Sequence, residues 1–306
     1  MTLRLRDLTL DLDPGAPALM GIVNATPDSF SDAQGEKRLA ELVELALDLA
    51  DAGAAIVDVG GESGRTDRPA VGVEEEIARV VPLIRRLAGE GVAVSVDTWR
   101  GPVARAALEA GAVMVNDVSG LSDPAIADAC AETGAGLAIT HTRVAPKTKG
   151  FPVYDDVVAD VLELLADRCA LARDRGVGIE QLLLDPGIDL AKTPAESIEL
   201  LRRLPELESL GRPLLLAISR KDFVVALTGR SPRERDPGTL AAIEPALDVA
   251  TGAVLRVHDV GAARDFAAVR TALRGTAPAP EGALEDALRR ESAPGQPVAF
   301  AARNRP

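Results

Sequence analysis

Short apolar segments recur along the chain, and each one ends in a polar or charged residue. We predict strands at Ala18–Val23, Ala55–Val59, Ala93–Asp97, Val113–Asn116, Leu137–His141, Leu182–Asp185, Leu214–Ala217 and Val254–His258. Most of these are continuous apolar runs, as expected for parallel strands that are covered on both faces. Segments with apolar residues at every third or fourth position lie between them, for example Leu39–Ala52 and Asp155–Arg175, and this spacing is typical of amphipathic helices. Eight alternations of strand and helix predict an α/β fold, a (β/α)8 TIM barrel.

The two ends of the chain differ from this pattern. Residues 3–12 alternate leucine with charged residues, which predicts a short N-terminal hairpin that turns at Arg6 and Asp7 and closes the barrel floor. Residues 276–306 are rich in proline and alanine, and we expect a disordered C-terminal tail there. We therefore divide the chain into a barrel domain over residues 1–275 and a tail over residues 276–306.

Composition narrows the class of protein. The chain has 306 residues, of which 47% are hydrophobic, and this is enough for one large core. A formal net charge of −13 argues against a nucleic-acid or membrane-surface partner. The sequence has neither a membrane-length apolar run nor the apolar core of a signal peptide, so we expect a cytoplasmic protein. Cys130 and Cys169 lack metal-ligand spacing, and we expect free thiols.

Polar side chains at the strand ends form a candidate site, because active sites of such barrels lie at the C-terminal ends of the strands. Asp97, Asn116 and Asp185 offer carboxylate and amide groups to a flat heterocycle. A carboxylate matches a ring N–H beside an exocyclic amine through two parallel hydrogen bonds. Lys221 can donate to a ring carbonyl and nitrogen. The alternatives are barrel-mouth salt bridges or helix caps for the two aspartates and a solvated ammonium for Lys221.

A second group of residues suggests an anion site. Arg256 and His258 lie two positions apart on the eighth strand, so their side chains share a face. A lone arginine inside a barrel is costly, and the guanidinium fork suits phosphate. Asn24 would complete the site, directly or through Mg²⁺, and Arg65 would close over the same anion. The alternatives are a structural role for His258 and an exposed loop charge for Arg65.

The strand-end motifs occur in a fixed order that resembles one family. They are Asn24–Asp32, Gly60–Ser63, Ser95–Thr98, Val115–Gly120, Leu184–Gly187, Ser219–Lys221 and Arg256–Val260. Over residues 19–274 this set resembles the dihydropteroate synthase family, a family of pterin-binding barrels. The resemblance implies a transferase of folate biosynthesis. Such an enzyme condenses 4-aminobenzoate with (7,8-dihydropterin-6-yl)methyl diphosphate and releases dihydropteroate and diphosphate.

The resemblance also implies roles for individual residues. The pterin would be held by Asp97, Asn116, Asp185 and Lys221. The diphosphate would leave with help from Mg²⁺, Asn24, Arg65, Arg256 and His258, with Asn24 as a metal ligand. The carboxylate of 4-aminobenzoate would meet Ser219 and Arg220. Catalysis would depend mainly on Lys221, Asp97 and Arg256, and the barrels of this family are often homodimers packed through helices of the C-terminal half.

The chain departs from the family around the second substrate. Gly64 and Thr66 stand where the family usually has Thr and Pro, and Ala217 replaces a small Gly. Residues 189–192 read Asp-Leu-Ala-Lys where the family has a Gly-Phe-Gly-Lys type sequence. An alternative is therefore a pterin-binding paralogue that uses 4-aminobenzoate poorly or accepts another amine. A pterin-dependent methyltransferase domain is a third hypothesis, and the anion site argues against it. The loop over Arg143–Pro152 either closes over the site or is solvated.

Overall fold

The computed structural model describes residues 1–25, 33–64, 66–278 and 281–282. Within these ranges, eight parallel strands close into a barrel in the order β10-β3-β4-β5-β6-β7-β8-β9. The strands are β3 (Ala18–Asn24), β4 (Ile56–Gly60), β5 (Val94–Asp97), β6 (Met114–Asp117), β7 (Gly136–Thr140), β8 (Leu182–Asp185), β9 (Leu214–Leu216) and β10 (Ala253–Val257). Each end lies within one residue of its predicted position, and the predicted (β/α)8 barrel is confirmed.

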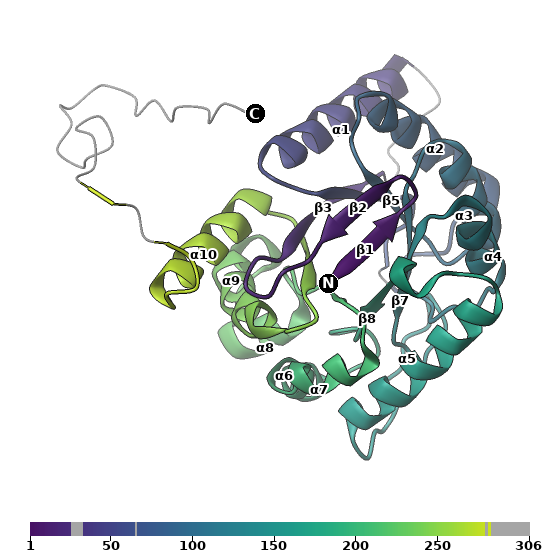
Figure 1. Cartoon of the computed structure of the whole chain (residues 1–306). Helices are drawn as coiled ribbons and strands as arrows, with labels where there is room; N and C mark the ends of the chain where they lie inside the picture. Colours follow the sequence, from purple (N-terminus) through teal and green to yellow (C-terminus); the bar gives the residue numbers. More distant parts are fainter. Residues whose placement is uncertain (26–32, 65, 279–280, 283–306) are drawn as a thin grey trace.

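Helices surround the barrel (Figure 1). They are α1 (Ala33–Asp51), α2 (Val73–Gly89), α3 (Gly101–Glu109), α4 (Ala125–Thr133), α5 (Val157–Asp174), α6 (Pro194–Arg202), α7 (Leu204–Leu207), α8 (Asp222–Thr228), α9 (Asp236–Ile243) and α10 (Val260–Leu273). Short 3₁₀ helices cover Ile179–Gln181, Glu208–Leu210, Pro232–Glu234 and Glu244–Asp248. In the part of the chain that the structure describes, no helix is both long and apolar enough to cross a membrane.

The predicted hairpin closes one end of the barrel. Strands β1 (Thr2–Leu5) and β2 (Leu8–Asp11) pair antiparallel and lie across the barrel end in Figure 1. Arg6 adopts a left-handed conformation, with a φ of 57°, at the predicted turn. The buried leucines of this segment pack with the lower lumen of the barrel. This group contains Leu3, Leu5, Leu12, Met20, Ile56, Met114, Ala138, Leu183, Leu215 and Val254.

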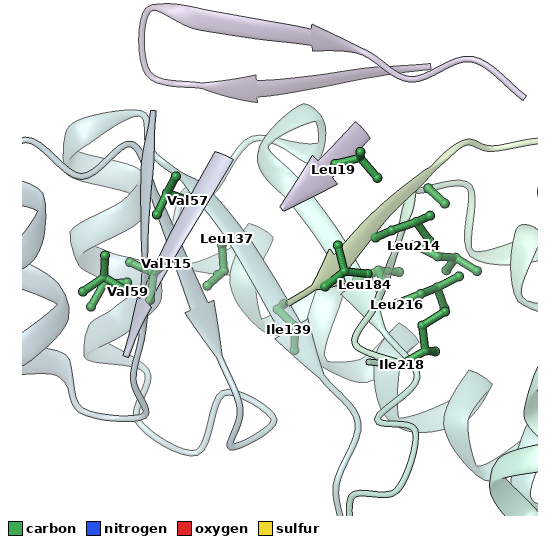
Figure 2. Close-up of a cluster of buried hydrophobic side chains, with 14 of the residues drawn as sticks. Leu19, Val57, Val59, Val115, Leu137, Ile139, Leu184, Leu214, Leu216 and Ile218 are labelled. Carbon is green, nitrogen blue, oxygen red and sulfur yellow. The ribbon is translucent and has the colours of Figure 1, made fainter. Parts of the chain in front are cut away.

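The other face of the barrel strands forms the main core. Figure 2 shows outward-facing strand residues such as Val57, Val115 and Leu184 in one buried cluster. Successive side chains of a strand point to opposite faces, so the residues between them point into the lumen. Asn24 pairs with Gly60, Gly60 with Asp97, and Asp97 with Asn116 in the strand register. The register therefore brings three of the predicted site residues to one level at the barrel mouth.

Two predictions fall on residues outside the described ranges. Helix α10 ends at Leu273, close to the predicted domain boundary at residue 275. The predicted tail is described only over residues 276–278 and 281–282, and Arg65 is also outside the described residues.

Candidate active site

The lumen above the apolar floor holds a buried ionic cluster centred on Asp58. Asp58 is fully buried in the middle of β4, and its Oδ2 accepts a hydrogen bond from Arg256 Nε at 2.6 Å. The same oxygen accepts a second hydrogen bond from Asn116 Nδ2 at 3.0 Å. Arg256 Nη2 also donates to Asp97 Oδ2 at 2.8 Å. Asp58 thus joins three residues that the sequence predicted separately.

Acceptor atoms in this cluster lack donors. Among the described residues, the buried Asp58 Oδ1 and Asn116 Oδ1 have no hydrogen-bond partner. A buried acceptor that stays unsatisfied costs about 1–3 kcal/mol. The pKa of Asp97 is raised to about 7, mainly by burial; the Arg256 charge opposes this rise and the Asp58 carboxylate adds to it. The cluster is therefore poised to receive a ligand that brings N–H donors.

Asp185 and Lys221 lie near the same cluster, Asp185 at the end of β8 and Lys221 directly before α8. Asp185 ends β8, is 4% exposed, and its Oδ1 accepts the N–H of Gly187 at 2.7 Å. Burial raises the pKa of Asp185, whereas Lys221, Lys192 and Arg256 act to lower it. Burial lowers the pKa of Lys221, and the carboxylates of Asp189, Asp185 and Asp97 oppose that shift. Within the described ranges the Lys221 ammonium makes no hydrogen bond or ion pair, so it is available to a ligand.

His258 and Ser219 form a pair beside the cluster. The Ser219 hydroxyl accepts the backbone N–H of His258 at 3.2 Å, and its Oγ lies 2.9 Å from His258 Nδ1. When the hydroxyl donates its own proton to Nδ1, the imidazole proton is on Nε2. The pKa of His258 is lowered to about 4, mainly by burial and also by the charges of Arg220 and Arg256. At neutral pH His258 is therefore a neutral N–H donor.

The remaining predicted residues differ in how they reach the site. Asn24 is exposed at the end of β3. A Cβ placed on Gly60 would lie at ordinary contact distance from both groups, 3.6 Å from Asp97 Cβ and 3.9 Å from Asn24 Oδ1, so Gly60 lies beside both of them. The Arg220 guanidinium pairs with Asp236 through Nε at 2.7 Å and Nη2 at 2.9 Å. Arg220 itself is in a left-handed conformation, with a φ of 59°.

Comparison with known proteins places this chain in a family. The model of the pterin-binding enzymes matches residues 20–258. The dihydropteroate synthase of Synechocystis is 42% identical over 260 residues, covering 83% of this chain and 89% of that protein. The Escherichia coli synthase is 41% identical over 252 residues, covering 81% and 89%. The solved structure of the Xanthomonas albilineans synthase is 42% identical with a TM-score of 0.79, covering 90% of this chain and 99% of that one.

The chain belongs to the dihydropteroate synthase family. The enzyme is thus a transferase of folate biosynthesis, as the ordered motifs predicted. The comparisons give no support to the alternative of a paralogue without efficient 4-aminobenzoate turnover.

The loop after β7 crosses the mouth of the enzyme's barrel. Lys147 Nζ lies 3.2 Å from Glu62 Oε1 and donates to the backbone oxygen of Ser63 at 2.6 Å. Glu62 is also bound by Arg100 Nη1 at 2.9 Å, and that same nitrogen bonds the fully buried Glu76. The sequence left open whether this loop is solvated or closes over the site. In the structure, Lys147 binds the loop to the segment that follows β4.

Two parts of the site escaped sequence reasoning. Asp58 carries a signal in retrospect, because it is the single charged residue in the buried run Ile56–Gly60. Lys192 is 2% exposed and donates to the backbone oxygens of Gly187 at 3.0 Å, Leu190 at 3.2 Å and His141 at 3.3 Å. Burial lowers the pKa of Lys192 to about 7. Its Nζ also lies 2.9 Å from His141 Nδ1. Sequence reasoning noted Lys192 only as the last residue of the 189–192 motif and gave it no role.

Proposed function

We propose that the lumen cluster binds the dihydropterin ring of the diphosphate substrate, and that the enzyme joins this pterin to 4-aminobenzoate. The observation that carries the proposal is the pair of donor-deficient buried oxygens, Asp58 Oδ1 and Asn116 Oδ1. The 2-amino-4-oxo edge of a pterin supplies N–H donors to such oxygens, and Asp97 and Asp185 supply further acceptors. Lys221 faces the same space and donates to the ring carbonyl and N5.

Related structures support this substrate pair. The Xanthomonas albilineans synthase has been solved with 4-aminobenzoic acid and, in another structure that is 41% identical to this chain, with 7,8-dihydropteroate. The second structure has a TM-score of 0.78 and covers 90% of this chain. A barrel of the same family with a matching set of strand-end motifs is expected to act on the same chemical groups.

The diphosphate would lie between Arg256, His258 and Asn24. Arg256 already binds Asp97 and Asp58, so it links the proposed pterin pocket to the proposed anion pocket. His258 contributes a neutral Nε2–H donor. As diphosphate leaves, positive charge develops on the pterin methylene, and the carboxylates around the ring stabilise it. Arg65 is expected to close over the same anion.

The residues fit a Mg²⁺ ion that arrives with the diphosphate. No group of three histidine, cysteine, aspartate or glutamate residues able to hold a metal occurs in the described part of the chain. Mg²⁺ commonly uses one or two protein oxygens together with substrate phosphates and water. The side-chain oxygen of Asn24 provides such a ligand. When bound, the ion would neutralise charge on the leaving group.

The second substrate would enter beside Ser219 and Arg220. Two nitrogens of the Arg220 guanidinium bind Asp236. Its Nη1 forms no hydrogen bond within the described ranges and is free to meet the carboxylate of 4-aminobenzoate. This geometry holds the guanidinium in place while one donor remains open.

We also propose a cytoplasmic homodimer. Leu227 on α8 and Val269 and Leu273 on α10 are large exposed apolar side chains, and α9 packs against both helices. An apolar surface of this kind is suited to association of two copies. Cys130 and Cys169 are free thiols, which is typical of a reducing compartment. Sedimentation of the wild type and of Leu273→Glu tests the dimer, and a monomeric wild type would contradict it.

Turnover with both substrates tests the function. The purified enzyme is incubated with the hydroxymethyl-dihydropterin diphosphate, 4-aminobenzoate and Mg²⁺, and diphosphate and dihydropteroate are both measured. We expect equal amounts of the two products and their loss in Lys221→Ala and Arg256→Ala. Arg105→Ala is the control, because Arg105 pairs with the exposed Glu132 on the outer surface. Binding of the pterin diphosphate without dihydropteroate formation would overturn the proposal.

A further inference from the structure

Asp189 connects the loop after β8 to the segment that carries Lys221. Its backbone is left-handed, with a φ of 64°, a conformation that few residues other than glycine, asparagine and aspartate adopt. Its Oδ2 accepts the backbone N–H of Asp222, which lies 33 residues further along the chain. Both carboxylate oxygens lie 3.3 Å from the backbone nitrogen of Phe223. These are the first two amides of α8, which begins directly after Lys221.

Asp189 is itself held from a third element. The Ser197 hydroxyl, fully buried on α6, accepts the backbone N–H of Asp189 at 3.1 Å. The same Oγ lies 3.3 Å from Asp189 Oδ1 and donates to it. The backbone and the carboxylate of Asp189 are both fixed, so the contact with α8 is a rigid connection.

The connection bears on Lys221 in two ways. Lys221 precedes the two amides that Asp189 binds, so the same contact sets the position of its backbone. The Asp189 carboxylate also acts on the ammonium directly. It is the strongest of the neighbouring charges that keep the pKa of Lys221 from falling further as burial lowers it.

We propose that Asp189 is a positioning residue for Lys221: its carboxylate binds the first two amides of α8, directly after Lys221, and so directs this side chain at the pterin. The inference rests on the proposed role of Lys221 in pterin binding. The opposing possibility is that Asp189 only caps a short helix and contributes to stability alone.

Two substitutions separate these possibilities. Asp189→Gly removes the carboxylate, and Asp189→Asn keeps one acceptor oxygen without the charge. Both residues tolerate the left-handed backbone, so neither adds strain. We expect the KM for the pterin diphosphate to rise about tenfold in Asp189→Gly and less in Asp189→Asn, with the KM for 4-aminobenzoate unchanged.

A second readout does not depend on turnover. The pH dependence of Lys221 acylation by a trace amine-reactive reagent, followed by mass spectrometry, reports the pKa of this ammonium. We expect a lower midpoint in both variants than in the wild type, because a neighbouring negative charge is lost. Asp156→Asn is the matched control, since the Asp156 carboxylate caps α5 by accepting the amides of Val158 and Ala159.

The outcomes distinguish the inference from the function on which it rests. A stability loss like that of Asp156→Asn, with the Lys221 midpoint and pterin KM both unchanged, would overturn the positioning role. Full activity in Lys221→Ala would instead overturn the proposed role of Lys221. A midpoint shift in the Asp189 variants would then still establish the coupling between the two side chains.

Discussion

A carboxylate in the middle of a buried strand is stable only with partners, because an isolated buried charge costs several kcal/mol. Asp58 obtains two partners, Arg256 and Asn116, that come from strands on either side of it. Asp58 in turn provides an ionic partner for Arg256, which also binds the carboxylate of Asp97. At the scale of single residues, the centre of the site is therefore a charge network in which Arg256, Asn116 and, through Arg256, Asp97 are joined by one residue that was not predicted.

Asp58→Asn tests this dependence. The substitution leaves Arg256 with a single carboxylate, and we expect the free energy of unfolding to fall by about 3 kcal/mol, as for other broken buried pairs. Pterin binding should weaken as well. Urea denaturation measures the stability, and Glu132→Gln in the exposed pair with Arg105 provides a control that should change nothing measurable. Equal stability of Asp58→Asn and the wild type would contradict the network.

The pKa of Asp97 predicts the pH dependence of activity. If pterin binding requires the ionised carboxylate, kcat/KM for the pterin diphosphate should fall about tenfold per pH unit below about 7. The folded pKa lies above the unfolded value, so the folded state binds this proton more tightly. Protonation of Asp97 therefore adds stability as pH falls from 7 towards 4, and the loss of activity is separable from acid unfolding. The Asp97→Asn variant should lack this decrease of kcat/KM at low pH. An unchanged decrease in that variant would show that another group causes it.

At the scale of elements, the loop between β8 and α6 shows how a strained segment is held. Asp189 and Ala191 both have positive φ, at 64° and 54°, without being glycine. Lys192 binds carbonyls on both sides of this turn, and the Thr193 side chain caps α6 through the amide of Glu196. Buried hydrogen bonds from neighbouring elements thus compensate a backbone conformation that the residues themselves disfavour.

Ala191→Gly should therefore stabilise the enzyme. Removing the strain of the left-handed alanine should raise the free energy of unfolding by about 1–2 kcal/mol. Glycine has greater freedom in the unfolded chain, and this offsets about 0.4–1 kcal/mol of the gain. We expect a higher urea midpoint with unchanged slope. The same change at the exposed Ala40 in the middle of α1 should lower stability by about 0.5–1 kcal/mol. A loss of stability in both variants would rule out strain at Ala191.

At the scale of the whole molecule, the barrel separates stability from chemistry along its axis. The hairpin and the lower lumen form an apolar plug at one end, and the ionic cluster lies at the strand ends on the other. Gly136 on β7 leaves room for this plug, because a Cβ there would lie 2.3 Å from Leu5 Cδ2. Substitutions in the plug are expected to act on folding and to leave the site intact.

Leu5→Ala tests the separation. Leu5 is fully buried, and we expect its truncation to lower the free energy of unfolding by about 3 kcal/mol. The KM values for both substrates should stay within twofold of the wild type. Leu8→Ala is the control on the same hairpin, because Leu8 is 37% exposed. A large rise in either KM for Leu5→Ala would show that the floor and the site are coupled.

The predicted strands agree with the structure because buried parallel strands have sharp polar ends. Helix starts were harder to locate. Helix α1 begins at Ala33, six residues before the predicted Leu39, because its first turns carry Glu36, Lys37 and Arg38 and lack an apolar stripe. Helix α5 agrees closely, since Asp156 marks its start by accepting two amides.

The sequence by itself determined the barrel, its hairpin floor, the family and most of the candidate site. Strands and helices alternate along the chain, so all barrel strands run parallel and the polar residues at their C-terminal ends lie at the same mouth. Only the tertiary structure decided which of these residues touch. It paired Arg256 with Asp58 and Asp97, turned Arg220 towards Asp236, and joined Asp189 to the start of α8. These contacts join residues from 16 to 198 positions apart, and their partners are fixed by barrel closure and loop geometry. Local sequence spacing carries no information about either.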